Sequence, residues 1–283
     1  MRAVERQASW ALTEEAPEVH PRASTDPVPR ARASQEQGTV VSQTGPEVRV
    51  VSTLQALAEE AAGLLRHAAE RAVANRGRFT LALSGGQTPL LLYRQLAAAG
   101  PDALPYDRME IFWSDERAVP PDHPDSNYHL VWEAWLAHAP LDARRIHRIR
   151  GEDGPAAAPA YEAELRTLLG DPPRLDLILL GVGRDGHTAS LFSDTATVDA
   201  TRLVIATVAP FPPQDRVTFT FPLIWSAATV LVLVAGPDKA QAVRQALLDR
   251  PSATIPSSNL RAPHMIWLLD EAAAAALPGG AAD

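Results

Sequence analysis

The sequence of 283 residues contains no cysteine. This absence excludes disulfide bonds, thiolate nucleophiles and cysteine-ligated zinc, and it suits a reducing compartment. The sequence also lacks any apolar run close to the roughly 20 residues that cross a bilayer. Arg2 and Arg6 stand near the start, but no apolar segment follows them, so we expect no secretory signal. These absences predict a cytoplasmic protein that has no membrane partner.

The sequence also has no excess of basic residues over acidic ones. Asp and Glu number 34 against 26 Lys and Arg, and the formal net charge is -8. Nucleic-acid partners select a basic face, so we expect no nucleic acid to bind. An acidic protein that binds an anionic substrate must gather its cations at one place. A few arginines in loops are therefore more informative than the overall charge.

Residues 1–47 have little apolar periodicity and are rich in Pro, Ser, Glu, Arg and Gln. Such a segment cannot bury enough surface to offset the entropy that ordering costs. We predict a disordered tail over residues 1–47 and a single α/β domain over residues 48–283. A reading frame that is assigned too early a start, or a regulatory arm, would have the same composition.

Helical and strand patterns alternate from residue 48 onward. Ser52 followed by Gln55 resembles a capping box and predicts a helix over residues 53–75. Further helices are expected over residues 88–99, 128–138, 156–169, 238–248 and 271–276. Strands are expected over residues 79–83, 109–113, 175–180, 203–208, 217–220, 230–234 and 265–269. This alternation predicts an α/β fold, a mainly parallel sheet with helices on both faces.

Ligands of such sheets lie outside the carboxyl ends of the strands, which directs attention to the loops after residues 83, 113 and 180. The first loop reads Ser84, Gly85, Gly86, Gln87, Thr88 and Pro89. Paired glycines let backbone N–H groups turn toward an anion, and a helix N-terminus adds a favourable dipole. The hydroxyls of Ser84 and Thr88 are further donors. The loop fits either a phosphate site or an ordinary tight turn, and no Gly-Lys-Thr follows to make a Walker A loop.

The second loop, residues 114–127, contains the run Asp115-Glu116-Arg117. A guanidinium can bind a phosphate or a carboxylate through two bonds, so Arg117 is a candidate substrate contact. Asp115 and Glu116 fit either the orientation of a sugar or the anchoring of the loop, and a solvated charge run is the plain alternative. The loop's histidine and the next one stand six residues apart, which matches no common metal-ligand pattern. We therefore expect no metal.

The third loop, residues 181–186, matches G-x-G-x-x-G after a strand. A dinucleotide site would place an acidic residue about 20 positions later, and residues 206–208 contain none. The run Asp185-Gly186-His187 is more informative, because a histidine at the mouth of the sheet can transfer protons near neutral pH. Arg216, at the start of a later strand, is either a second phosphate contact or a surface arginine. Lys239 is a weaker candidate of the same kind.

These loops together resemble the 6-phosphogluconolactonase family. The resemblance covers about residues 48–275 and excludes the N-terminal tail. The segments that carry it are residues 83–89, 113–117, 125–127, 181–192 and 213–218.

The resemblance implies a modified Rossmann-like fold that glucosamine-6-phosphate deaminases and ribose-5-phosphate isomerases share. It implies hydrolysis of 6-phospho-D-glucono-1,5-lactone to 6-phospho-D-gluconate, the second step of the oxidative pentose phosphate pathway. It also implies that His187 is catalytic, that residues 84–88 with Arg117 and Arg216 hold the substrate, and that there is no cofactor. Our hypothesis adds Asp185, or a nearby backbone carbonyl, as the group that orients the imidazole. We expect a monomer or a weak homo-oligomer.

Two other functions are weighed against this one. The deaminase branch also has an Asp-Gly-His loop but continues Ile-Ala-Phe-Asn-Glu-Pro, and its glutamate corresponds to Phe192 here, which cannot transfer a proton. That branch also has Asp-Glu-Tyr where this chain has Asp115-Glu116-Arg117. A sugar-phosphate sensor would need a DNA-binding module, and residues 1–47 lack the periodicity of a helix-turn-helix. Both comparisons favour the lactonase.

Overall fold

The computed structural model describes residues 45–194 and 200–278, and its strands form two sheets. The larger sheet has six strands in the order β1-β9-β8-β5-β2-β3, and every neighbouring pair is parallel. Its strands are β1 Glu47–Val51, β2 Phe79–Leu83, β3 Met109–Trp113, β5 Leu177–Leu180, β8 Thr229–Val234 and β9 His264–Asp270. The smaller sheet is antiparallel and has the order β4-β7-β6. Its strands are β4 Asp115–Arg117, β6 Val204–Val208 and β7 Asp215–Phe219.

Continuous apolar sequence explains why the larger sheet is parallel and buried. Every residue of β2 and β5 is buried, as expected for strands that are covered on both faces. The edge strand β1 instead alternates between half-buried and exposed residues.

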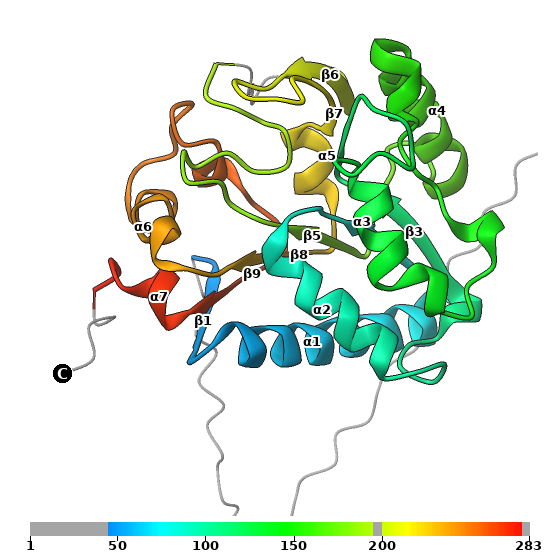
Figure 1. The fold of residues 1–283 in the computed structure, drawn as a ribbon, viewed down its shortest axis with the longest axis horizontal. Helices are drawn as coiled ribbons and strands as arrows, with labels where there is room; N and C mark the ends of the chain where they lie inside the picture. The colour runs from blue at the N-terminus through cyan, green and yellow to red at the C-terminus, as the bar shows by residue number, and fades with distance from the viewer. Residues whose placement is uncertain (1–44, 195–199, 279–283) are drawn as a thin grey trace, which may run out of the picture. The chain divides into compact units, whose positions relative to one another are not determined.

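The helices cover the two faces of the larger sheet, which confirms the predicted fold class. They are α1 Leu54–Arg76, α2 Gln87–Ala98, α3 Asn127–Ala134, α4 Ala157–Leu169, α5 Phe221–Ser226, α6 Ala240–Leu248 and α7 Glu271–Ala274. From β1 through β2 to β3 the chain advances across the sheet, and it then returns through β5, β8 and β9. Because parallel crossovers are right-handed, this reversal places the connecting segments on opposite faces. In Figure 1, α1 and α2 lie below the strands, and α5 lies above them with β6 and β7.

The smaller sheet is the main departure from the predicted elements. The prediction of a loop over residues 114–127 was wrong for residues 115–117, which form β4. A three-residue polar strand has no apolar alternation by which it could be recognised. The strands expected over residues 203–208 and 217–220 exist as β6 and β7, but they pair antiparallel with each other.

Several element boundaries also differ from the prediction. Thr53, not Ser52, caps α1, since its hydroxyl accepts the N–H of Ala56 at 3.1 Å. The helix expected over residues 128–138 ends at Ala134 and continues as a 3-10 turn. The strand β1 and the short helix α5 were not predicted at all.

The predicted tail over residues 1–47 lies mostly outside the described residues, and β1 already begins at Glu47. The division at residue 48 therefore stays a prediction. Within the described residues, no helix is both long enough and apolar enough to span a membrane.

Candidate active site

The three predicted loops meet around one cavity of about 430 Å³ at the carboxyl ends of β2 and β5. Arg216 and Lys239 reach it from β7 and from the 3-10 turn before α6. Of the residues singled out in the sequence, those that line the cavity are Ser84, Gly85, Gly86, Thr88, Asp115, Arg117, His187, Arg216 and Lys239. Parallel strands explain this meeting, because their carboxyl ends lie along one edge.

His187 lines the cavity and can move a proton there, whereas Asp185, its bonded carboxylate, is not among the lining residues. Nδ1 of His187 lies 2.5 Å from Oδ1 of Asp185, and the His187 backbone N–H donates to the same oxygen at 3.2 Å. The hydrogen bond from His187 lowers the pKa of Asp185, which keeps that carboxyl ionised at neutral pH. Nε2 of His187 makes no hydrogen bond to the described residues, and 22% of the side chain is exposed. It can therefore act as a base or an acid toward a molecule in the cavity.

Glycines in the His187 loop provide room for this pair. A Cβ on Gly183 would lie 2.1 Å from Nδ1 of His187 and 2.5 Å from Oδ1 of Asp185. Gly186 has a positive φ of 79°, and a Cβ there would meet Ile255 at 2.9 Å. The glycines of the G-x-G-x-x-G pattern thus leave the space in which the side chains of His187 and Asp185 lie.

The loop before α2 presents backbone donors to the cavity. Gly86 is the N-cap of α2 with a φ of 102°, and no side chain caps the first turn. The first N–H groups of the helix are therefore open to an external acceptor, and the helix dipole favours an anion there. Gly85 permits close approach of the next loop, because a Cβ would lie 1.8 Å from Oδ1 of Asn127.

Two arginines face each other across the antiparallel pair of β4 and β7, where Arg117 and Arg216 are Cα partners. Arg216 is only 4% exposed, and its Nε donates to the carbonyl of Pro213 at 2.7 Å. Burial, together with the charge of Arg117, lowers the pKa of Arg216. Arg117 donates to the carbonyl of Asp125, and its buried Nε has no partner among the described residues. Like charges opposite each other are unfavourable, so the pair is suited to an anion between them.

The acidic residues beside Arg117 anchor the loops. Asp115 Oδ2 accepts the hydroxyl of Ser190 at 2.7 Å, and Asn127 Nδ2 donates to the Asp115 carbonyl at 2.9 Å. Asp115 thus joins the second loop to the His187 loop, although it also lines the cavity. Glu116 is buried away from it and accepts bonds from the hydroxyl of Ser126 and from three backbone N–H groups. Burial raises the pKa of Glu116 against the effect of these bonds.

Sequence reasoning gave no part in the site to several residues that line the cavity, among them Asn127, Phe192 and Phe211. The buried Oδ1 of Asn127 has no hydrogen-bond partner among the described residues. The rings of Phe192 and Phe211 lie 4.8 and 5.9 Å from the His187 ring. The position of Asn127 at the start of a helix was a usable signal, since a loop that enters a helix often carries ligands.

The chain matches the model of the glucosamine-6-phosphate isomerases/6-phosphogluconolactonase family over residues 52–267. It belongs to this family. A 6-phosphogluconolactonase of Nostoc sp. is 40% identical over 238 residues, which are 81% of this chain and 98% of that protein. One of Streptomyces coelicolor is 37% identical over 248 residues, which are 82% of this chain and 95% of that protein.

Solved structures of family members agree with this assignment. The 6-phosphogluconolactonase of Leishmania guyanensis superposes with a TM-score of 0.72 at 29% identity, over 83% of this chain and 99% of that one. That of Thermotoga maritima gives 0.70 at 27% identity, over 80% of this chain and 99% of that one. A monomeric glucosamine-6-phosphate deaminase gives 0.70 over 81% of this chain and 99% of that one. Its 24% identity shows a shared fold and nothing more.

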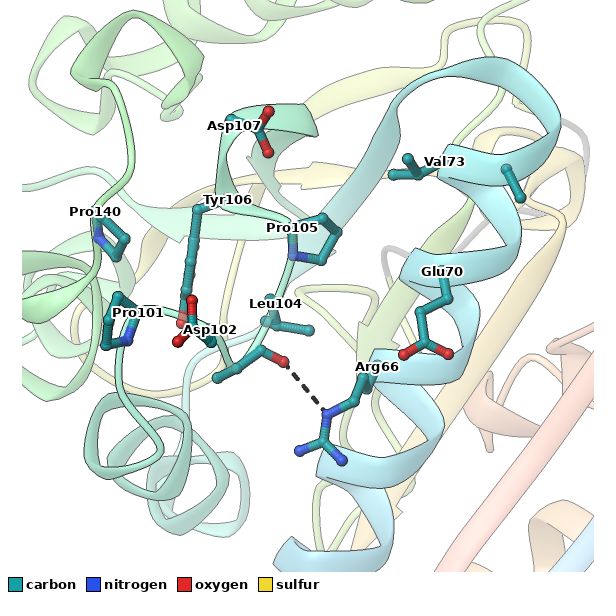
Figure 2. Close-up of a pocket in the computed structure, with 12 residues that line it drawn as sticks. Arg66, Glu70, Val73, Pro101, Asp102, Leu104, Pro105, Tyr106, Asp107 and Pro140 are labelled. Carbon is teal, nitrogen blue, oxygen red and sulfur yellow. Dashed lines mark hydrogen bonds between the residues drawn. The ribbon is translucent and has the colours of Figure 1, made fainter.

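This family member also has a larger cavity, of about 770 Å³, between α1 and the segment before β3. Figure 2 shows the residues that line it, among them Arg66 and Glu70 on α1 and Asp102 and Asp107 on that segment. Nε of Arg66 donates to the carbonyl of Ala103 at 3.3 Å. Three carboxylates make this cavity a poor site for a phosphate. Nowhere in the described residues do three or more His, Cys, Asp or Glu side chains group as a metal would require.

Proposed function

We propose that this chain hydrolyses 6-phospho-D-glucono-1,5-lactone to 6-phospho-D-gluconate, the second step of the oxidative pentose phosphate pathway. One observation carries the proposal: His187, whose Nδ1 is bonded to Asp185, lines the same cavity as the facing arginines Arg117 and Arg216. A proton-transfer group at one place and an anion site at another are what a phosphorylated lactone requires. Relatives named 6-phosphogluconolactonase at 37–40% identity support the same reaction.

The phosphate end of the substrate is assigned to Arg117 and Arg216. An anion between them would relieve their repulsion and would supply a partner for the unpaired Nε of Arg117. The open N–H groups at the start of α2, with the hydroxyl of Thr88, are further donors, and the hydroxyl of Ser84 would have to turn from the carbonyl of Gly85 to join them. A cavity of about 430 Å³ lies within the usual range for small-molecule sites, about 300–1,000 Å³.

The proton transfer is assigned to His187. Asp185 accepts from Nδ1–H, which leaves Nε2 to take a proton from water as the water oxygen attacks the lactone carbonyl. The C–O bond between that carbonyl carbon and the ring oxygen then breaks. The imidazolium returns its proton to the leaving ring oxygen, which becomes a hydroxyl. One water is consumed, and a carboxylic acid forms that ionises in solution.

The tetrahedral intermediate carries a negative oxygen that needs donors. Backbone N–H groups of the glycine loops or an arginine are assigned this role, since donors at the developing charge lower the barrier most. A lactone is already reactive, so general acid–base transfer of about 10²–10⁴-fold with positioning suffices.

The test is hydrolysis of freshly prepared 6-phosphogluconolactone, corrected for spontaneous opening, by the wild type and by His187→Ala and Arg117→Ala. We expect His187→Ala to lower kcat by about 10²–10⁴-fold with little change in KM. Arg117→Ala should mainly raise KM, since it removes a contact to the phosphate that exists before and during reaction. A His187→Ala variant that keeps the full rate would refute the assignment of the catalytic residue.

The lactonase reaction is preferred to deamination because of the surroundings of His187. Phe192 is buried and its ring lies 4.8 Å from the imidazole, so an apolar group stands where a second proton-transfer group would serve ring opening. A wild type that does not accelerate lactone hydrolysis but releases ammonia from glucosamine 6-phosphate would reverse this preference.

We further propose that the enzyme acts in the cytoplasm as a monomer or a weak homo-oligomer, without a nucleic-acid partner. A cysteine-free, acidic chain supports this placement. Cell fractionation would refute the location by recovering the protein in another compartment. Sedimentation at several concentrations would refute a weak assembly by finding one stable oligomer.

A further inference from the structure

The hairpin loop between β6 and β7, residues 209–214, brings an exposed aromatic ring to the cavity. The N–H of Ala209 donates to the carbonyl of Gln214 at 2.7 Å and closes the base of this loop. Phe211 at its tip is 41% exposed and lines the cavity. Among the large hydrophobic side chains exposed in the described residues, it is the aromatic one.

The ring of Phe211 is held in a defined place although it is exposed. It meets Phe192 edge-on at 5.6 Å, with an interplanar angle of 90°. Its centroid lies 5.9 Å from the His187 ring, and the guanidinium carbon of Arg216 lies 5.7 Å from it. Phe211 therefore borders both the proton-transfer group and the arginine pair.

We propose that Phe211 is a substrate-binding residue that packs its exposed ring surface against the C–H groups of the lactone ring. This inference rests on the proposed function, in which the phosphate lies at the arginines and the carbonyl lies at His187. A substrate that spans these two groups passes beside Phe211.

The chemistry of a sugar lactone suits this contact. Its hydroxyls need polar partners, but its ring carbons present C–H groups that gain from leaving water. An aromatic face is electron-rich and accepts such weakly positive hydrogens. A substrate that binds there also covers apolar surface that the free enzyme exposes, which is favourable in proportion to the area covered.

The experiment compares Phe211→Ala, Phe211→Tyr and the wild type in hydrolysis of 6-phosphogluconolactone. Covering about 40–60 Å² of ring surface predicts that Phe211→Ala raises KM by about five- to tenfold. We expect kcat to stay within about threefold, because the contact exists before and during the reaction. Phe211→Tyr keeps the ring and should stay within about twofold of the wild-type KM.

Inorganic phosphate is the probe for the arginine pair alone. Because Phe211 also contacts Arg216, its removal could disturb the phosphate site, and inhibition by inorganic phosphate measures that directly. We expect its inhibition constant to be the same in Phe211→Ala and in the wild type. Leu248→Ala, which removes a 50% exposed apolar side chain from the end of α6, is the matched control and should change neither constant.

Three results would overturn the inference while leaving lactone hydrolysis intact. The first is an unchanged KM in Phe211→Ala. The second is an equal rise of KM and of the phosphate inhibition constant, which would mean that Phe211 acts only through Arg216. The third is a Phe211→Tyr variant that is as impaired as Phe211→Ala. A wild type without hydrolytic activity would overturn the proposed function and this inference with it.

Discussion

Single residues of the His187 loop show how little space the proposed proton-transfer pair occupies. His187 and Asp185 lie against the bare Cα of Gly183, and any side chain there would have to overlap the imidazole. The buried ring of Phe192 bounds the imidazole on another side, with the two ring centroids 4.8 Å apart. The orientation of the ring is therefore set by contact on several sides.

Replacement of Gly183 by alanine tests this packing. The added Cβ would stand 2.1 Å from Nδ1 of His187, so the imidazole must leave its place or lose its bond to Asp185. We expect kcat for 6-phosphogluconolactone to fall by at least about 10²-fold, as for loss of general acid–base transfer. The side chains that must shift are partly exposed, 22% for His187 and 50% for Asp185, so the melting temperature should fall by only a few degrees, about what 1 kcal/mol produces.

Gly63 provides the control for that substitution. It lies exposed in α1, and a Cβ there meets nothing within 4 Å. Gly63→Ala should stabilise the helix by about 0.5–1 kcal/mol and leave kcat unchanged. Wild-type turnover in Gly183→Ala, measured beside Gly63→Ala by the same assay and by thermal unfolding, would show that the His187 position is not constrained in this way.

The sequence allows prediction of those cavity-lining residues that follow strands. It does not reveal those whose importance depends on contacts with residues distant in the sequence. That His187 and Arg117 line the cavity was predictable, because each lies in the segment that follows an apolar strand. Phe211 was not, because its significance comes from contacts with Phe192 and Arg216. No local pattern distinguishes an exposed phenylalanine that lines a cavity from one that does not.

At the scale of elements, the antiparallel sheet of β4, β7 and β6 determines where the arginines meet. Register, not proximity in sequence, places Arg117 opposite Arg216. The pairing partners are almost 100 residues apart, and side-chain alternation over three polar residues cannot specify a register. Most strands of the parallel sheet were predictable because they are largely apolar, whereas the edge strand β1 and the polar strand β4 were not.

The helix α4 is tied to the small sheet by one carboxylate. Glu162 accepts the N–H groups of Leu203 and Val204 at 3.0 and 3.3 Å, and it pairs with Arg202 at 3.1 Å and Arg166 at 3.2 Å. Burial raises its pKa, but these bonds outweigh burial, and the pKa lies below the usual value. The ionised form of Glu162 is therefore preferred in the folded state.

Lowering the pH should weaken the bonds that Glu162 makes to the small sheet. Because the folded pKa of Glu162 is lowered, its contribution to stability is present above the unfolded pKa of about 4.5 and is lost as pH falls through the folded pKa. We expect Glu162→Gln to lower the free energy of unfolding by about 1–3 kcal/mol at pH 7. The difference from the wild type should shrink below about pH 4.5, where the wild-type carboxyl becomes protonated.

Urea unfolding of both proteins between pH 3 and pH 7 measures this difference. The exposed Glu133 of α3 offers a matched substitution, and Glu133→Gln should leave the curve unchanged within about 0.5 kcal/mol. A constant gap between Glu162→Gln and the wild type across this range would contradict an ionisation effect.

For the whole molecule, the distribution of charge is as informative as its sum. The chain carries a net charge of -8, yet four cationic side chains line the same cavity. They are Arg117, Arg184, Arg216 and Lys239. Arg184 and Lys239 share Asp238 at 2.7 and 3.9 Å, and burial lowers the pKa of Lys239. An acidic protein can thus offer a local cationic site to an anionic sugar, as the composition led us to expect.

The division of the chain near residue 48 gives the last prediction. The family match begins at residue 52, and the Nostoc relative is covered over 98% of its length by 81% of this chain. Every residue that lines the proposed site lies between Ser84 and Lys239. We therefore expect a chain that begins at Gly45 to keep kcat and KM within about twofold and to unfold within about 2 °C of the full chain.

A chain that begins at Ser52 is the contrast, since it also lacks β1. In the larger sheet β1 pairs with β9 from Glu47 opposite Ile266 to Val51 opposite Asp270, so its loss exposes a buried strand as a new edge. This shorter chain should unfold several degrees lower and aggregate more readily. Thermal unfolding and lactone hydrolysis of both chains measure the outcome. Loss of activity in the chain from Gly45 would contradict the prediction of a tail, because it would mean that residues 1–44 contribute to the active site.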